Sequence, residues 1–331
     1  MKRNHVIAAV LAGGAIVAVL RGHSDRRAAP APTAGTRSGN MASWFITYER
    51  PMAPPGSIKQ VITPDHGCLL KITGSVVGVD LPDRAEIGRY ATPLPAAEAE
   101  TLKALAVSAV DEASALKGMT VPRGTRFMTF GLGRTGEDID SLASFPLSES
   151  FPQAIKRFDE SMLALAKRML DHPQATLRGT AICEPGTLTP QENLAVTLTL
   201  RNSGPAPIRI QNPAAAASDE KVGLQVTVDK ELPPGKEDEG AMKFVRLTRG
   251  EVSQQKPRES DRGGAIRSMV ELAPGGEIVF SLRLQRRLYL GTGAYRAWVT
   301  YESSTENVPE QAAVEGSLKI PAGTFSVKAK R

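Results

Sequence analysis

The stretch that most constrains the fold of this chain runs from Gln191 to Ile210 (QENLAVTLTLRNSGPAPIRI). Apolar residues recur at every second position of its first half, at Leu194, Val196, Leu198 and Leu200. This period of two predicts an extended strand with one apolar and one polar face. Asn202 to Pro205 then break the pattern as a turn would, and Ile208 and Ile210 resume it. The stretch therefore predicts a strand, a turn and a second strand.

Length and charge narrow the class of protein. A chain of 331 residues has room for two domains of ordinary size. Its formal net charge of +6 arises mostly in residues 1–43, which hold six Lys or Arg and one Asp. Neither half of the remaining chain has the one-sided basic charge that phosphate backbones require. Nucleic-acid binding is therefore not expected.

The N-terminus has the pattern of an export segment. Lys2 and Arg3 precede an uninterrupted apolar run over residues 6–20, as the basic and hydrophobic parts of a signal sequence do. The run is short for a permanent membrane span, which needs about 20 residues. No clean cleavage site follows it, so a cleaved signal and a membrane anchor both stay open. We expect residues 1–27 to be this segment, followed by a flexible Ala- and Pro-rich linker over residues 28–43.

Residues 44–175 predict an α+β domain. Short strand-like pieces separated by turn residues extend from Trp44 to Tyr90. Apolar residues then recur at spacings of three and four over 96–115 and over 152–170, which indicates two helices, with one more strand predicted at 125–130 between them. A small antiparallel sheet covered by two helices is the economical packing of these elements.

Residues 176–331 predict an all-β domain. Strand-like segments such as EIVFSLRL (277–284) and GAYRAWVTY (293–301) alternate apolar and polar residues, and turn clusters separate them. Strands that each have one apolar face need a second sheet to cover that face. The pattern therefore predicts a two-sheet sandwich.

This second region resembles a bacterial immunoglobulin-like domain in its order of strands and in the Gly293-Ala294-Tyr295 entry into a late strand. The resemblance implies a structural tyrosine corner at Tyr295, whose hydroxyl would bond to upstream backbone. Ala297 stands where the second core cysteine of antibody domains would be. The resemblance covers the fold and names no ligand.

Two motifs that can carry chemistry lack the context that the chemistry needs. Gly131 to Gly136 spells GxGxxG after a predicted strand, but no helix or βαβ repeat follows it, so we interpret it as a glycine-rich turn. Glu137, Asp138 and Asp140 lack the spacing of a calcium loop and are interpreted as a solvated turn. No metal and no cofactor are expected.

Groups for acid–base or nucleophilic catalysis are scarce. His5 and His23 lie in the exported tail, and His66 and His172 stand beside turn prolines without metal-binding spacing. No serine lies in a nucleophile elbow. We therefore expect no enzymatic activity.

The two cysteines, Cys68 and Cys183, lie one in each predicted domain. In an oxidising compartment such a pair can form a disulfide between the domains. Two separate buried thiols are the alternative.

Together these observations lead to one hypothesis and one alternative. The hypothesis is an exported, non-enzymatic protein-binding protein of the bacterial envelope, such as an inhibitor or an immunity protein for a secreted toxin. It would reside in the periplasm or at the inner membrane, attached through residues 6–20 if these are not cleaved. The alternative is an envelope enzyme or carbohydrate-binding module with a site between the two domains, for which Asp65, His66 and Asp138 are the candidates.

Overall fold

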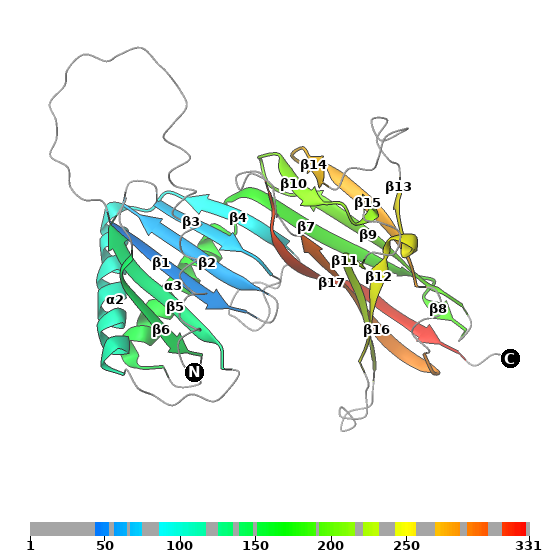
Figure 1. The fold of residues 1–331 in the computed structure, drawn as a ribbon, viewed down its shortest axis with the longest axis horizontal. Coiled ribbons are helices and arrows are strands. Elements are labelled where there is room, and N and C mark those ends of the chain that lie inside the picture. The colour runs from blue at the N-terminus through cyan, green and yellow to red at the C-terminus, as the bar shows by residue number, and fades with distance from the viewer. Residues whose placement is uncertain are drawn as a thin grey trace, which may run out of the picture.

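The fold is mostly β, with two α-helices and large antiparallel sheets (Figure 1). The computed structural model describes residues 44–52, 56–64, 67–74, 86–116, 125–134, 139–147, 151–189, 192–215, 221–231, 242–255, 269–284, 290–303 and 313–328. The predicted export segment and linker, residues 1–43, lie outside this part of the chain. In the described part no helix is long and apolar enough to cross a membrane.

The first half of the chain forms six strands of a ten-stranded sheet, with two helices on one face. Its elements are β1 (Trp44–Pro51), β2 (Ser57–Thr63), β3 (Gly67–Ile72), β4 (Glu86–Thr92), α2 (Ala96–Ala115), β5 (Phe127–Arg134), β6 (Ile139–Pro146) and α3 (Gln153–Met169). The strands lie in the order β4-β3-β2-β1-β5-β6, and all neighbours are antiparallel. The expected antiparallel strands and two helices are present, but the strands belong to a larger sheet than expected.

One core fills the space between this sheet and its helices. Alternate residues of β1, such as Ile46 and Tyr48, point into it, and α3 contributes Ile155, Phe158, Met162, Leu165 and Met169. The helices are also joined at one end by a cap. Glu112 of α2 accepts hydrogen bonds from the backbone amides of Ala154 and Ile155, at 2.8 and 3.0 Å. These amides open α3 and have no partner within the helix.

The second half of the chain is built of strands. They are β7 (Pro173–Glu184), β8 (Thr187–Leu188), β9 (Leu194–Asn202), β10 (Ile208–Gln211), β11 (Lys221–Lys230), β12 (Lys243–Thr248), β13 (Val252–Gln255), β14 (Met269–Leu272), β15 (Glu277–Leu284), β16 (Gly293–Ser303) and β17 (Gly316–Val327). β7, β9, β15 and β13 extend the first sheet to ten strands, and a separate five-stranded sheet has the order β12-β11-β16-β17-β8. β10 and β14 form a short two-stranded sheet.

A second core lies between these sheets. It contains Leu198 and Phe280 from the ten-stranded sheet and Val226 and Val299 from the five-stranded sheet. The sheets approach closely at Gly179, where an added Cβ would lie 2.3 Å from Cδ1 of Ile320. The two sheets therefore pack face to face, with apolar alternate residues on the facing sides.

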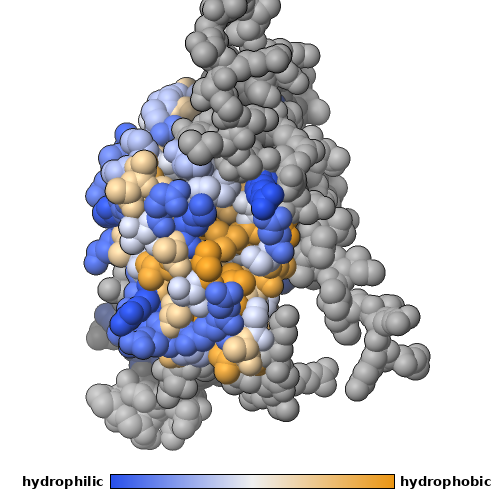
Figure 2. All heavy atoms as spheres, turned by 90° about the vertical axis from the view of Figure 1, so that its left-hand side faces the viewer, coloured by the Kyte–Doolittle hydropathy of each residue, from blue (hydrophilic) through white to orange (hydrophobic). Residues whose placement is uncertain are grey.

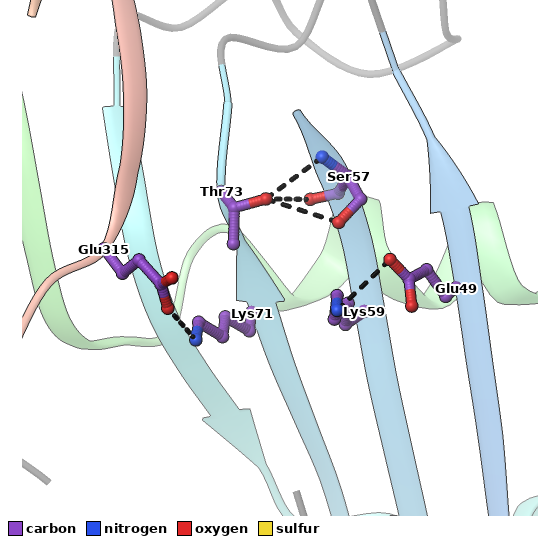
Figure 3. Close-up of polar contacts among 6 residues, drawn as sticks. All are labelled: Glu49, Ser57, Lys59, Lys71, Thr73 and Glu315. Atoms are coloured by element: carbon purple, nitrogen blue, oxygen red, sulfur yellow. Dashed lines mark hydrogen bonds and ion pairs between the residues drawn. The ribbon is translucent and has the colours of Figure 1, made fainter. Parts of the chain in front are cut away.

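The two halves share one sheet. β7 pairs with β4 on one side and with β9 on the other, and the expected domain boundary between residues 175 and 176 falls inside it. Figure 3 shows polar contacts near this junction, including the ion pair of Lys71 with Glu315 at 3.0 Å. Nearby, the backbone amide of Ser317 donates to the carbonyl of Thr73 at 2.8 Å. Direct contacts thus connect the end of β3 with the start of β17.

The two strands predicted in 191–210 are confirmed as β9 and β10, which belong to different sheets. The interpretation of the GxGxxG motif differs from the structure. Gly131 and Gly133 of the GxGxxG motif lie within β5, which pairs with β6 as an antiparallel strand, so this part of the motif is strand and not turn. Gly133 is needed for packing, because an added Cβ would lie 2.4 Å from the ring of Phe45. Residues Gly316–Val327 at the end of the chain form the single strand β17.

Candidate functional site

The outer face of the five-stranded sheet carries exposed aromatic and apolar residues. Side chains alternate along β12, so Val245 and Leu247 face the core while Phe244 and Arg246 face outward. The exposed fraction of Phe244 is 64%, and that of the neighbouring Met242 is 60%. Among the described residues of this half, one further large apolar side chain is exposed, Ile182 on β7 at 61%, and it lies on the other sheet.

Strand register aligns Phe244 with further residues across the sheet. Thr227 of β11 lies opposite Phe244, Trp298 of β16 lies opposite Thr227, and Pro321 of β17 lies opposite Trp298. Thr227 is only 6% exposed. Directly opposite side chains on one face of a sheet lie about 5 Å apart, so the larger neighbours cover it. We call Met242, Phe244, Thr227, Trp298 and Pro321 the aromatic face.

A polar row borders the aromatic face. Arg246, Gln225, Thr300 and Lys319 lie opposite one another on β12, β11, β16 and β17. The ammonium group of Lys319 lies 5.2 Å from the centre of the Trp298 ring, within the range of a cation–π contact. Arg246 makes no ion pair with any residue in the described part of the chain.

An exposed patch of this composition suits contact with another protein. Aromatic residues, Met and Arg are enriched at protein–protein interfaces relative to other surface. The face has no group of histidine, cysteine or carboxylate residues that could hold a metal, and none occurs elsewhere among the described residues. Chemically, the aromatic face can bury apolar side chains of a partner, and Arg246 in the bordering row can bind a carboxylate.

The segment MKFVRL carries a local signal for this face, because apolar residues fall on both sides of the extended chain. Met242 and Phe244 point to one side, and Val245 and Leu247 point to the other. A strand at the edge of a two-sheet structure has one core-facing side, so one of the two apolar sets must face solvent. The alternation alone does not say which set is buried.

Other exposed apolar residues lie in the first half of the chain. Figure 2 shows the end of the molecule near α2, where apolar surface gathers in the middle of the view within a hydrophilic border. Among the described residues of this half, the exposed large hydrophobic ones are Val107, Phe127 and Leu142. They lie on three elements, α2, β5 and β6, and no aligned row of aromatic residues connects them.

A small pocket of about 180 Å³ lies beside the edge strand β13. Gln254, Gln255 and Glu277 supply its polar lining, and Leu272 and Ile278 are among its apolar residues. The pocket is smaller than the usual 300–1,000 Å³ of a small-molecule site. Its lining lacks the paired acid and base that catalysis needs.

The two cysteines are free in the structure, so they are separate thiols and form no disulfide between the two halves. Cys68 on β3 is buried in the first core, and Cys183 near the end of β7 packs against the second. Cys68 lies opposite Thr92, which ends β4, whereas Arg178 of β7 lies opposite Glu86, which begins it. Cys183 lies still further along β7 in the same direction. Measured along the strands, Cys68 and Cys183 are therefore about 12 residues apart, or roughly 40 Å at 3.3 Å per residue. A disulfide requires Cα atoms within about 7 Å.

Tyr295 lies at the start of β16, and its hydroxyl donates a hydrogen bond to the backbone carbonyl of Gly291, at 2.9 Å. Its ring stacks on Phe325 with 5.5 Å between ring centres. Burial raises the pKa of this hydroxyl, so the group remains a protonated donor. Tyr295 thus anchors the chain that enters β16.

The candidates of the alternative hypothesis, Asp65, His66 and Asp138, lie outside the described residues, as does Glu137. Asp140 lies on β6, where its carboxylate is 3.7 Å from Arg134.

Comparisons with known proteins give no family for the chain. No family model and no curated protein match it. Among solved structures, the sporulation control protein Spo0M of Bacillus subtilis is 13% identical over 47% of this chain and 49% of its own, with a TM-score of 0.25. A β-glucosidase from Erythrobacter marinus is 12% identical over 45% of this chain and 15% of its own, with a TM-score of 0.23. A PapD-like domain of human CEP192 is 12% identical over 46% and 87%, with a TM-score of 0.21. Likenesses this weak carry no argument about function.

Proposed function

We propose that this chain is an exported, non-enzymatic protein-binding protein of the bacterial envelope, and that it binds its partner through the aromatic face. In this proposal residues 44–175 form an α+β domain and residues 176–331 an immunoglobulin-like sandwich. The N-terminal segment is a signal or an anchor in the inner membrane. An inhibitor or an immunity protein for a secreted toxin fits this description.

The observation that carries the proposal is the exposure of Phe244 and Met242 on a sheet face where Trp298 lies in the same cross-strand row as Phe244. Exposing these side chains to water is unfavourable, by about 25 cal/mol for each Å² of apolar surface. A partner that covers the face recovers this free energy. Trp, Tyr and Arg commonly contribute the most to binding when they are buried in an interface.

Two experiments test the proposal. Cell fractionation should find the full-length protein, expressed in a bacterium, in the periplasm or the inner membrane. A pull-down from envelope extract should recover one partner with the wild-type protein and with Val107→Ser, and lose that partner with Phe244→Ser. Val107 is a matched control because it is also an exposed apolar residue, 43% exposed, but lies on α2. Equal recovery with both variants would contradict the proposed face.

A further inference from the structure

β12 is an edge strand of the five-stranded sheet in the described part of the chain. Among the described residues it pairs with β11 alone, whereas the opposite edge is formed by β8, a strand of two residues. An edge strand presents backbone amides and carbonyls that can pair with another chain. Proteins usually protect such edges with proline, a bulge or several charges. The sequence of β12, KFVRLT, has no proline and two charged residues. The irregularity in its pairing with β11 lies between Lys221 and Gln225, beyond Arg246, so residues 243–246 pair regularly.

The side chains of β12 would give an added strand a defined pattern. In an antiparallel pair, residues directly opposite each other lie on the same face of the sheet. A residue opposite Phe244 would therefore contact the exposed ring on the outer face. A residue opposite Val245 would lie on the inner face, next to the partly buried Val245 and the core below it.

Charge complementarity determines the residue opposite Arg246. β12 carries Lys243 and Arg246 and no carboxylate. Opposite charges across a strand pair stabilise it, and a guanidinium can hold a carboxylate through two parallel hydrogen bonds. Because Arg246 is exposed and has no ion pair among the described residues, an acidic residue opposite it gains this contact without displacing one.

We propose that the partner is bound by strand addition: one of its extended segments pairs antiparallel with β12 as a sixth strand of the sheet. Read along the partner, this segment carries an acidic residue opposite Arg246, then an apolar residue opposite Val245, then an apolar residue opposite Phe244. The inference rests on the proposed function and adds the recognition mode and the chemistry of the partner segment. The backbone pairing supplies affinity, and the alternate side chains supply specificity.

The test uses two short synthetic peptides that contain Glu-Val-Leu or Lys-Val-Leu within the same extended sequence. The full-length protein should bind the acidic peptide saturably at low salt and the basic peptide more weakly, by roughly fivefold. Arg246→Glu should reverse this order. Hydrogen exchange of the β12 amides should slow when the acidic peptide is bound. Val107→Ser should behave as wild type in every measurement.

Three results would overturn strand addition: no binding of the acidic peptide, equal binding of both peptides, or binding without slower exchange in β12. These outcomes are separable from failure of the proposed function. If Phe244→Ser abolishes partner capture but the β12 amides gain no protection with the captured partner, the aromatic face still binds the partner, but by side-chain packing alone. If capture does not depend on Phe244, the proposed function itself fails.

Discussion

Asp159 on α3 accepts a hydrogen bond from the hydroxyl of Tyr48 on β1, with 2.5 Å between the two oxygens. The same carboxylate pairs with Arg50, whose guanidinium lies 5.9 Å from the centre of the Phe151 ring. Asp159 is 4% exposed, and burial together with the charge of Asp159 raises the pKa of Tyr48 well above its usual value. The tyrosine therefore stays a protonated donor, and the helix is joined to the sheet by a buried polar network.

We expect Asp159→Ala to lower the free energy of unfolding by about 3 kcal/mol, because it leaves a buried hydroxyl and a largely buried guanidinium without their acceptor. Urea unfolding followed by circular dichroism measures this change. Glu160→Ala is the control, since Glu160 forms an exposed pair with Lys156 at 3.8 Å, worth at most about 0.5 kcal/mol. Equal effects of the two substitutions would show that the network does not hold α3 on the sheet.

Gly133→Ala should destabilise the protein by about 1–3 kcal/mol, because the new methyl group would overlap the ring of Phe45. Gly186→Ala is the matched substitution, since no atom lies within 4 Å of the Cβ it would add. Thermal unfolding of both variants distinguishes the two positions. A Gly133→Ala protein as stable as wild type would remove the packing explanation for this glycine of the GxGxxG motif.

Burial raises the pKa of the Cys68 thiol to about 12 and that of the Cys183 thiol to about 11. Both thiols are therefore protonated and poorly reactive at pH 8. Iodoacetamide should modify the folded protein slowly, and Cys183 first, because it is only partly buried. Without reductant, denaturant should make both thiols react fast, as followed by mass spectrometry. Resistance of both thiols in denaturant would instead reveal a disulfide.

The raised pKa values of these thiols also predict how the free energy of unfolding changes at alkaline pH. Because both folded pKa values are raised, the folded state keeps protons that the unfolded state loses above its ordinary thiol pKa of 9.0. The free energy of unfolding should therefore decrease as pH rises from about 9 toward 11–12. A double Cys→Ala variant should lose part of this decrease in urea titrations. An unchanged pH dependence would contradict the contribution of the thiols.

Asn202 is fully buried where β9 ends, and its side-chain amide donates to the backbone carbonyls of Ala206 and Leu272, at 2.8 and 3.0 Å. Its carbonyl oxygen accepts from the amide of Gly204 at 2.9 Å. Asn202→Ala should cost about 2 kcal/mol of unfolding free energy, because buried backbone groups lose their partners. Thr199→Ala, on the outer side of the same strand, should change it little. Chemical unfolding of the two variants decides whether Asn202 secures this turn.

Local patterns predicted much of the fold. The helix over 96–115 coincides with α2, because Pro95 precedes a run of apolar residues at spacings of three and four. The strand over 277–284 coincides with β15, where strict alternation matches one buried face. β6 was not predicted, because IDSLASFP combines serines and a proline without clear alternation. It is held as a strand by pairing with β5, a contact that its own sequence does not encode.

Long-range pairing explains why the site was harder to predict. The continuous sheet depends on β4 meeting β7, and β4 and β7 are separated by two helices and two strands in the chain. Likewise, Phe244 and Trp298 share a row only because β11 lies between β12 and β16. Neither arrangement follows from local periodicity. The aromatic face therefore became visible only once the strand order was known.

The most direct test of binding through the aromatic face is photocrosslinking in living cells. The photoreactive amino acid p-benzoylphenylalanine is placed at position 244 in one strain and at position 107 in another, and adducts are identified by mass spectrometry after illumination. The account predicts one dominant protein adduct from position 244 and no such adduct from position 107. No adduct from position 244, or the same adducts from both positions, would contradict it.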